Sequence, residues 1–127
     1  HAPEDYHQDH RTLSKYVKNA ARFDCPVIFC DTLLGVNFLP EYYVDITNYF
    51  DLKKEAIMAH KSQNPERFCD AIEIQNRFRA AQCNSPKGHY AEAYRFEKSF
   101  PFSDVRQLIP EAPKYRPYYQ NLKSSLI

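Results

Sequence analysis

The segment that decides the fold class is PVIFC, residues 26–30. It is short, apolar and rich in residues that favour β-structure, and Asp31 and Thr32 follow it. We therefore expect a buried strand, of the kind that parallel sheets contain. Residues 42–46, with the sequence YYVDI, alternate weakly between polar and apolar side chains and are expected to form a second strand.

Helical patterns flank these two strands. Asp9 lies where a helix N-cap is expected, so His10 would fall in the first turn. The buried face of that helix is expected to consist of Leu13, Tyr16, Val17 and Ala20. Another helix should begin between residues 48 and 51, and a third at Asn64-Pro65, with Asn as the cap and Pro at the first helical position. The third helix is supported by apolar residues that continue at helical spacing, namely Phe68, Ala71, Ile74, Phe78 and Ala81.

This alternation of strands and helices predicts an α/β fold. Two strands are too few for a stable open sheet, because three or more are normally needed, so we expect further strands elsewhere. The pattern of residues 90–96 is ambiguous between helix and strand. We assign residues 1–100 to one domain portion, and residues 101–127, which are rich in Pro and Tyr, to an extended tail that packs on the surface or against another subunit.

Composition excludes several classes of function. A formal net charge of +1 offers no field for nucleic acid or an anionic membrane surface. No segment approaches the roughly 20 apolar residues of a membrane span. With 2 glycines, the chain has no phosphate-binding glycine loop. The 4 cysteines match no zinc-finger spacing and are expected to be reduced, mostly packed thiols, which favours a cytoplasmic location. Disulfides are the alternative if the protein is secreted.

The sequence YHQDHR, residues 6–11, is the strongest local signal for chemistry. Imidazole and carboxylate groups are ligands that suit Zn²⁺. The side chains of adjacent residues diverge, so these residues are not expected to be three ligands of one metal. A better division of roles is one ligand, one orienting carboxylate and one acid–base histidine. On these residues alone, a solvated polar loop with ordinary surface histidines remains an open alternative.

Four ordered segments resemble the zinc-dependent N-deacetylases of the LmbE/PIG-L family. They are HQDHR at 7–11, YVDIT at 43–47, AHKSQ at 59–63 and YAEAY at 90–94. The resemblance implies a Rossmann-like three-layer fold, of which this chain is the C-terminal part, and zinc-dependent hydrolysis of an N-acetyl group on a GlcNAc-type amino sugar. It also implies a possible homo-oligomer.

The resemblance also implies roles for individual residues. His10 would bind the metal, and His7 would stabilise the oxyanion or protonate the leaving amine. Asp9 would orient a histidine. Residues expected at the substrate or around the site are Arg11, His60, Tyr90 and Glu92.

The chain departs from the family at one point, because it contains no HPDDE sequence. Two zinc ligands and the general base are therefore missing. We expect a partner in the form of an N-terminal half that carries HPDDE, and we expect the 127-residue chain alone to be inactive and to hold zinc weakly. The chain would be either a fragment or a decayed relative. The alternative function is a non-catalytic binding or assembly module that retains the fold.

Overall fold

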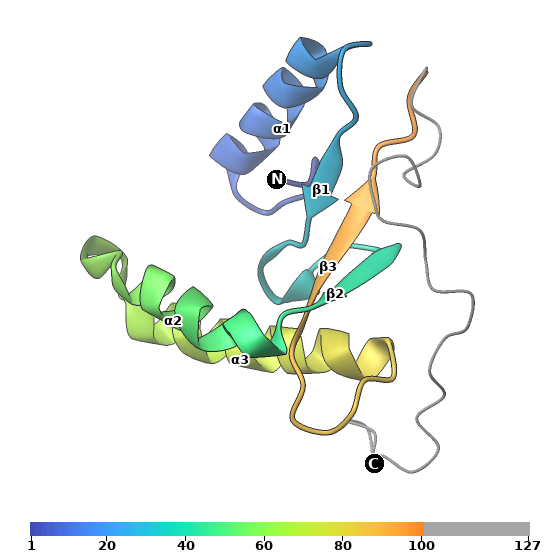
Figure 1. Ribbon diagram of the computed structural model, residues 1–127. Coiled ribbons are helices and arrows are strands. Elements are labelled where there is room, and N and C mark those ends of the chain that lie inside the picture. Colours follow the sequence, from blue (N-terminus) through green and yellow to red (C-terminus); the bar gives the residue numbers. More distant parts are fainter. Residues whose placement is uncertain (101–127) are drawn as a thin grey trace.

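The computed structural model describes residues 1–100 (Figure 1). The tail expected at 101–127 lies outside the described residues. The main elements are α1 (Gln8–Ala21), β1 (Ile28–Cys30), β2 (Tyr42–Asp45), α2 (Phe50–Met58), α3 (Pro65–Gln82) and β3 (Ala91–Phe96). Short 3-10 helices span Leu33–Gly35, Thr47–Tyr49 and Lys61–Gln63.

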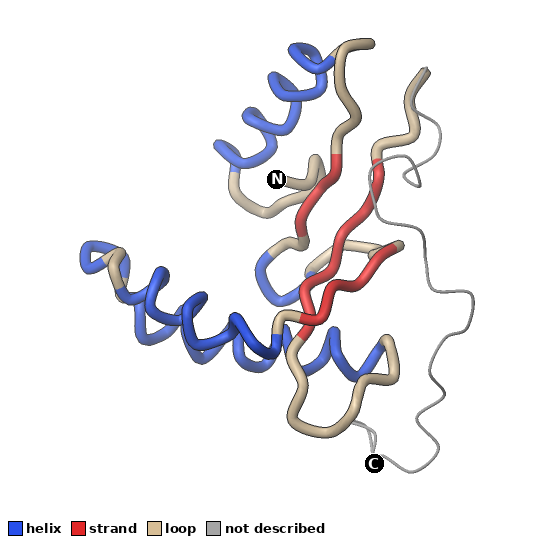
Figure 2. The backbone as a smooth tube through the Cα atoms, viewed as in Figure 1, coloured by secondary structure: helices blue, strands red, loops and turns tan. Residues whose placement is uncertain are grey.

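The three strands form one sheet in the order β1-β3-β2, and both pairings are antiparallel. The α/β class is confirmed as a mixture of helices with a small sheet, whereas the expectation of a parallel sheet was wrong. The reason is β3, which arises from the ambiguous segment and lies between the two predicted strands (Figure 2). Its alternating burial supplies the third strand that the sheet requires.

The core lies around β1 and β3. Phe29 and Phe38 pack there with Ala2 and Ala93, and all four side chains are buried. Helix α3 contacts β3 and the Leu33–Gly35 turn, and α2 packs along α3. In Figure 1, α1 stands beside β1, apart from the α2–α3 pair.

The apolar stripe of α1 is exposed, which contradicts the buried face predicted for it. Leu13, Tyr16 and Val17 are 48%, 67% and 42% exposed. Only Ser14 and Ala21 of this helix are buried. The physical reason is that β1 is an edge strand, so the sheet described in residues 1–100 ends before it can cover the stripe.

Helix α3 begins as predicted, at Pro65 after Asn64, but its buried face is partly polar. Ile74 and Phe78 are exposed, whereas Asn76 and Arg79 are buried. The Arg79 guanidinium binds both carboxylate oxygens of Asp31, at 2.6 and 3.0 Å. The apolar residues of α3 are therefore covered only in part, and hydrogen-bonded polar groups fill much of the space against the sheet.

A glycine allows Arg79 to occupy this position. Gly35 has a φ of +70°, and a Cβ at that residue would lie 2.5 Å from Arg79 Nη2. Any side chain at residue 35 would therefore be strained in its backbone and would displace the guanidinium.

All four cysteines are free, as expected, but Cys25, Cys30 and Cys83 are exposed rather than packed. Among the helices of residues 1–100, none has both the length and the apolar character of a membrane span.

Candidate metal and active site

The start of α1 is held by its own side chains. His7 is the N-cap, and its Nδ1 accepts a hydrogen bond of 3.2 Å from the Asp9 backbone N–H. Asp9 therefore lies in the first turn instead of at the predicted cap. Arg11 donates to the backbone carbonyls of Asp5 and Tyr6, at 2.8 and 2.7 Å. These bonds fix the turn that leads into the helix and so fix the direction of His10.

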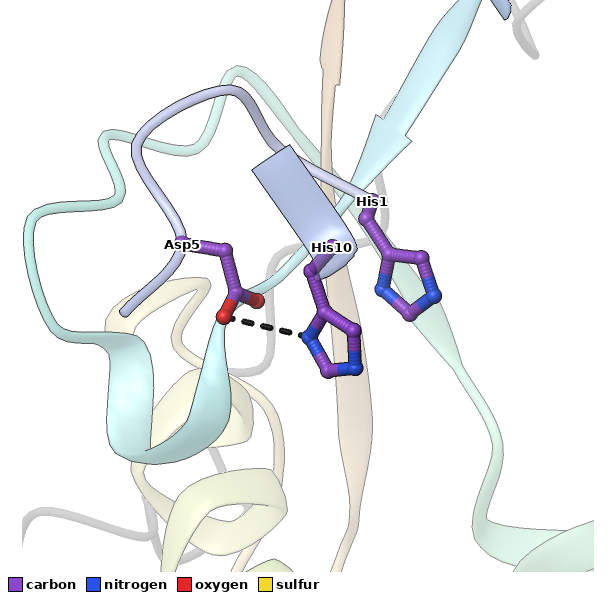
Figure 3. A group of neighbouring side chains, drawn as sticks. All are labelled: His1, Asp5 and His10. Carbon is purple, nitrogen blue, oxygen red and sulfur yellow. Dashed lines mark ion pairs between the residues drawn. The ribbon is translucent and has the colours of Figure 1, made fainter. Parts of the chain in front are cut away.

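Three side chains converge beside this turn, and we call them the His1–Asp5–His10 cluster (Figure 3). One potential ligand atom from each lies within 4.8 Å of the other two. Asp5 Oδ1 is 3.1 Å from His10 Nδ1, and the rings of His1 and His10 stack with centroids 3.9 Å apart. The cluster thus joins a carboxylate to two imidazoles, a donor set that suits Zn²⁺.

The other two residues of the predicted catalytic group have different surroundings. The His7 ring lies beside that of His10, with centroids 4.8 Å apart. The Asp9 side chain is 88% exposed, and its carboxylate is 4.0 Å from His7 Nδ1. Hence His7 and His10 are brought together, while the carboxylate that contacts His10 belongs to Asp5.

A cavity of about 440 Å³ opens beside the cluster, and its lining includes His1, Asp5, Tyr6 and His10. Other parts of the wall come from α2, α3 and β3 through Lys53, Asn76, Glu92 and Tyr94. The structure therefore brings Glu92 to the same cavity as His10, although 82 positions (92 minus 10) separate them in the chain.

Polar groups hold Glu92 in a defined ionisation state. Lys53 Nζ lies 2.7 Å from Glu92 Oε1 and 3.0 Å from Asn76 Oδ1, and the Tyr94 hydroxyl donates to Glu92 Oε2. Burial alone would raise the pKa of Glu92, but the hydrogen bonds from Lys53 and Tyr94 outweigh it and lower the pKa below its ordinary value. Burial and the bond to Glu92 raise the pKa of Tyr94. At neutral pH the cavity wall thus presents the Glu92 carboxylate and the neutral Tyr94 phenol, with the Lys53 side chain bonded to the carboxylate.

The remaining predicted residues lie elsewhere. Arg11 is exposed and bonded to backbone, and His60 is exposed at the N-cap of the Lys61–Gln63 turn. Tyr90 stacks on Phe50, with ring centroids 3.6 Å apart. None of the three lines this cavity.

Sequence reasoning missed His1 and Asp5. Asp5 reaches His10 because the chain turns at residues 2–5, where the Asp5 backbone N–H donates to the Ala2 carbonyl. A lone acid five positions before His10 has no recognisable spacing for a metal site. The only available signal was the concentration of polar residues in the first ten positions.

His10 Nδ1 is buried and lacks a hydrogen bond of good geometry among the described residues, so its environment is set by the Asp5 carboxylate. Comparisons with protein-family models, with curated proteins and with solved structures found no match for this chain.

Proposed function

We propose that this chain supplies part of the active site of a zinc-dependent amide hydrolase that removes the N-acetyl group from a GlcNAc-type amino sugar. The observation that supports it most directly is the convergence of His1, Asp5 and His10 on a cavity, with His7 adjacent. The finer fold that goes with this function is the Rossmann-like three-layer arrangement of the LmbE/PIG-L deacetylases, with residues 1–100 as its C-terminal portion.

His10 is the metal ligand in this proposal. A bound zinc ion would supply hydroxide at neutral pH, by lowering the pKa of a water molecule to about 7. Asp5 contacts His10 at Nδ1, and the His1 ring stacks on the His10 ring (Figure 3).

His7 is the proton donor. Its Nδ1 accepts the Asp9 N–H, so in the neutral ring the proton resides on Nε2. An Nε2–H beside His10 can hydrogen-bond to the oxyanion of the attacked amide or pass a proton to the leaving amine. Asp9 contributes to this role through its backbone, which fixes the tautomer of His7.

The proposal includes a partner segment that carries HPDDE, because residues 1–127 contain no such sequence. That segment would bring the general base and two more ligands. Two features support it: the exposed stripe of Leu13, Tyr16 and Val17 on α1, and the edge position of β1. Both offer apolar or hydrogen-bonding surface on which further strands can rest.

The second candidate function is a non-catalytic binding or assembly module. The observation that favours it is again the absence of HPDDE from all 127 residues. In that case the cavity would bind a ligand without hydrolysing it. A zinc site would not be required.

The two candidates separate in one experiment on the native protein. Mass spectrometry determines whether the native polypeptide or its complex contains HPDDE, and acetate release from N-acetylglucosamine measures activity. We expect His7→Ala to reduce turnover about 10²- to 10⁴-fold, as removal of an acid–base group does. His60→Ala, at the exposed histidine outside the cavity, is the matched control and should retain activity.

An HPDDE-containing native protein that releases no acetate and holds no zinc would overturn the hydrolase proposal. A native protein that lacks HPDDE altogether would favour the binding module. For the isolated 127-residue chain we expect substoichiometric zinc by elemental analysis.

A further inference from the structure

Asp5 is a buried carboxylate with few partners. Its side chain is 4% exposed. Oδ1 accepts the His7 backbone N–H at 2.9 Å and lies 3.1 Å from His10 Nδ1. Among the ion pairs of residues 1–100, no Lys or Arg pairs with it. Burying a carboxylate is unfavourable unless donors surround it, so the His10 ring must present an N–H to Asp5.

The backbone around Asp5 is fixed at both of its polar groups. Its N–H donates to the Ala2 carbonyl at 3.2 Å, and its carbonyl accepts from Arg11 Nη1 at 2.8 Å. These two bonds fix the backbone from which the Asp5 carboxylate extends, relative to the first turn of α1. His10 Nδ1 lies 3.1 Å from this carboxylate and has no other hydrogen-bond partner among the described residues.

Asp9 has none of these properties. It is almost fully exposed, and the carboxylate contact recorded for it is the one at 4.0 Å from His7 Nδ1. Within the described part of the chain, the acid that touches His10 is Asp5.

We propose that Asp5 is the positioning residue of the metal site: it holds the proton of His10 on Nδ1 and leaves Nε2 as the metal-binding nitrogen. The metal part of this inference rests on the proposed function, whereas the tautomer does not. The nitrogen opposite the hydrogen-bonded one is the usual metal donor in carboxylate–histidine pairs, and loss of the carboxylate typically lowers metal affinity about 10- to 100-fold.

The first measurement is the His10 tautomer in the unmodified 127-residue chain. Two-bond ¹⁵N–¹H spectra at about pH 9, well above the ordinary histidine pKa, distinguish a protonated Nδ1 from a protonated Nε2. We expect the Nδ1–H form. A dominant Nε2–H form would overturn the inference, and this result needs no variant to fold.

The second measurement compares Asp5→Asn with Asp9→Asn. Asp5 Oδ1 faces both the His7 N–H and His10 Nδ1. An Asn that keeps its oxygen there is an uncharged, weaker acceptor, and one that turns its NH₂ there donates to His10 Nδ1 and favours the Nε2–H form. We expect a smaller Nδ1–H fraction in the spectrum, together with an affinity for Zn²⁺ about 10- to 100-fold weaker in titrations of the chain. Asp9→Asn should leave both the tautomer and the affinity unchanged.

Equal effects of the two substitutions would contradict a specific role for Asp5, as would an unchanged tautomer in folded Asp5→Asn protein. The outcome is separable from that of the proposed function. A native protein with the Nδ1–H tautomer but no acetate release keeps the positioning role and loses the hydrolase. An active native protein with the Nε2–H form supports the hydrolase and contradicts the positioning role of Asp5.

Discussion

Helices α1 and α3 flank the same sheet but bury different parts of themselves. Helix α3 buries Asn76 and Arg79, and both have hydrogen-bond partners: Asn76 donates to the Ala91 carbonyl at 2.8 Å, and Arg79 binds Asp31. Helix α1 buries Ser14, whose hydroxyl has no hydrogen-bond partner in the described chain, and Ala21. Beyond its first turn, α1 forms an ion pair between Lys18 and Glu97, 2.5 Å in length.

The two helices therefore contribute differently to the molecule. The α3 side combines buried charge with satisfied polar groups, so removal of one partner there should be strongly destabilising. The α1 side holds the histidines at its first turn while most of its length faces solvent. The candidate site is fixed locally, by the turn at residues 2–5 and by the hydrogen bonds of Arg11.

The largest expected effect is on the α3 side. Arg79→Ala should lower the free energy of unfolding by about 3–5 kcal/mol, because it leaves the Asp31 carboxylate, which is only 10% exposed, without its partner. Urea denaturation measures it. Arg77→Ala, at an exposed position of the same helix, is the control and should change stability by less than about 0.5 kcal/mol. Similar results for both would break the comparison.

The next effect tests the space around Arg79. Gly35→Ala should cost about 1–3 kcal/mol from backbone strain, and more from the displaced guanidinium. Gly88→Ala is the matched control, since its φ is +89° but nothing lies within 4 Å of the added Cβ. The excess loss of stability at residue 35 over residue 88 reports the contact with Arg79, and a negligible excess would mean that the guanidinium moves freely.

A smaller effect depends on pH. The pKa of Glu92 is lowered in the folded chain, so its contribution to stability is complete above its ordinary value of 4.5 and is lost as the pH falls through the folded value. Wild type should therefore exceed Glu92→Gln in stability most at neutral pH, and the gap should close in acid. Urea denaturation from about pH 7 to pH 3 measures the gap. A constant gap would show that Glu92 acts through packing alone.

The smallest effect is expected on α1. Tyr16→Ser should alter the free energy of unfolding by less than about 0.5 kcal/mol, because Tyr16 is exposed. Phe29→Ala, at the buried core ring, provides the contrast and should cost about 3–5 kcal/mol. A loss of several kcal/mol at Tyr16 would mean that another surface covers the stripe in solution.

Local patterns predicted the helices well. The Asn64-Pro65 start of α3 and the first-turn position of His10 both depend on neighbours in the sequence, so they can be recognised without the fold. Burial could not be recognised in the same way. Leu13 and Ile74 have the right spacing for a core face, yet whether a face is covered depends on strands and side chains distant in the chain.

The candidate site shows the same distinction between contacts of sequence neighbours and contacts that depend on the fold. His7 and His10 are three positions apart on one helical turn, so their proximity follows from sequence. Asp5 joins them only through the turn at residues 2–5, and Glu92 reaches the cavity only because β3 lies between β1 and β2. Contacts that depend on the order of the strands in the sheet leave no pattern among neighbouring residues of the sequence.

The edge position of β1 has a consequence for handling the protein. Its Ile28 side chain is exposed, and in residues 1–100 no strand pairs with its outer side. An unpaired backbone edge is a template for a strand of another molecule. The isolated chain should therefore self-associate as its concentration rises, and a peptide that pairs with β1 should compete with that association.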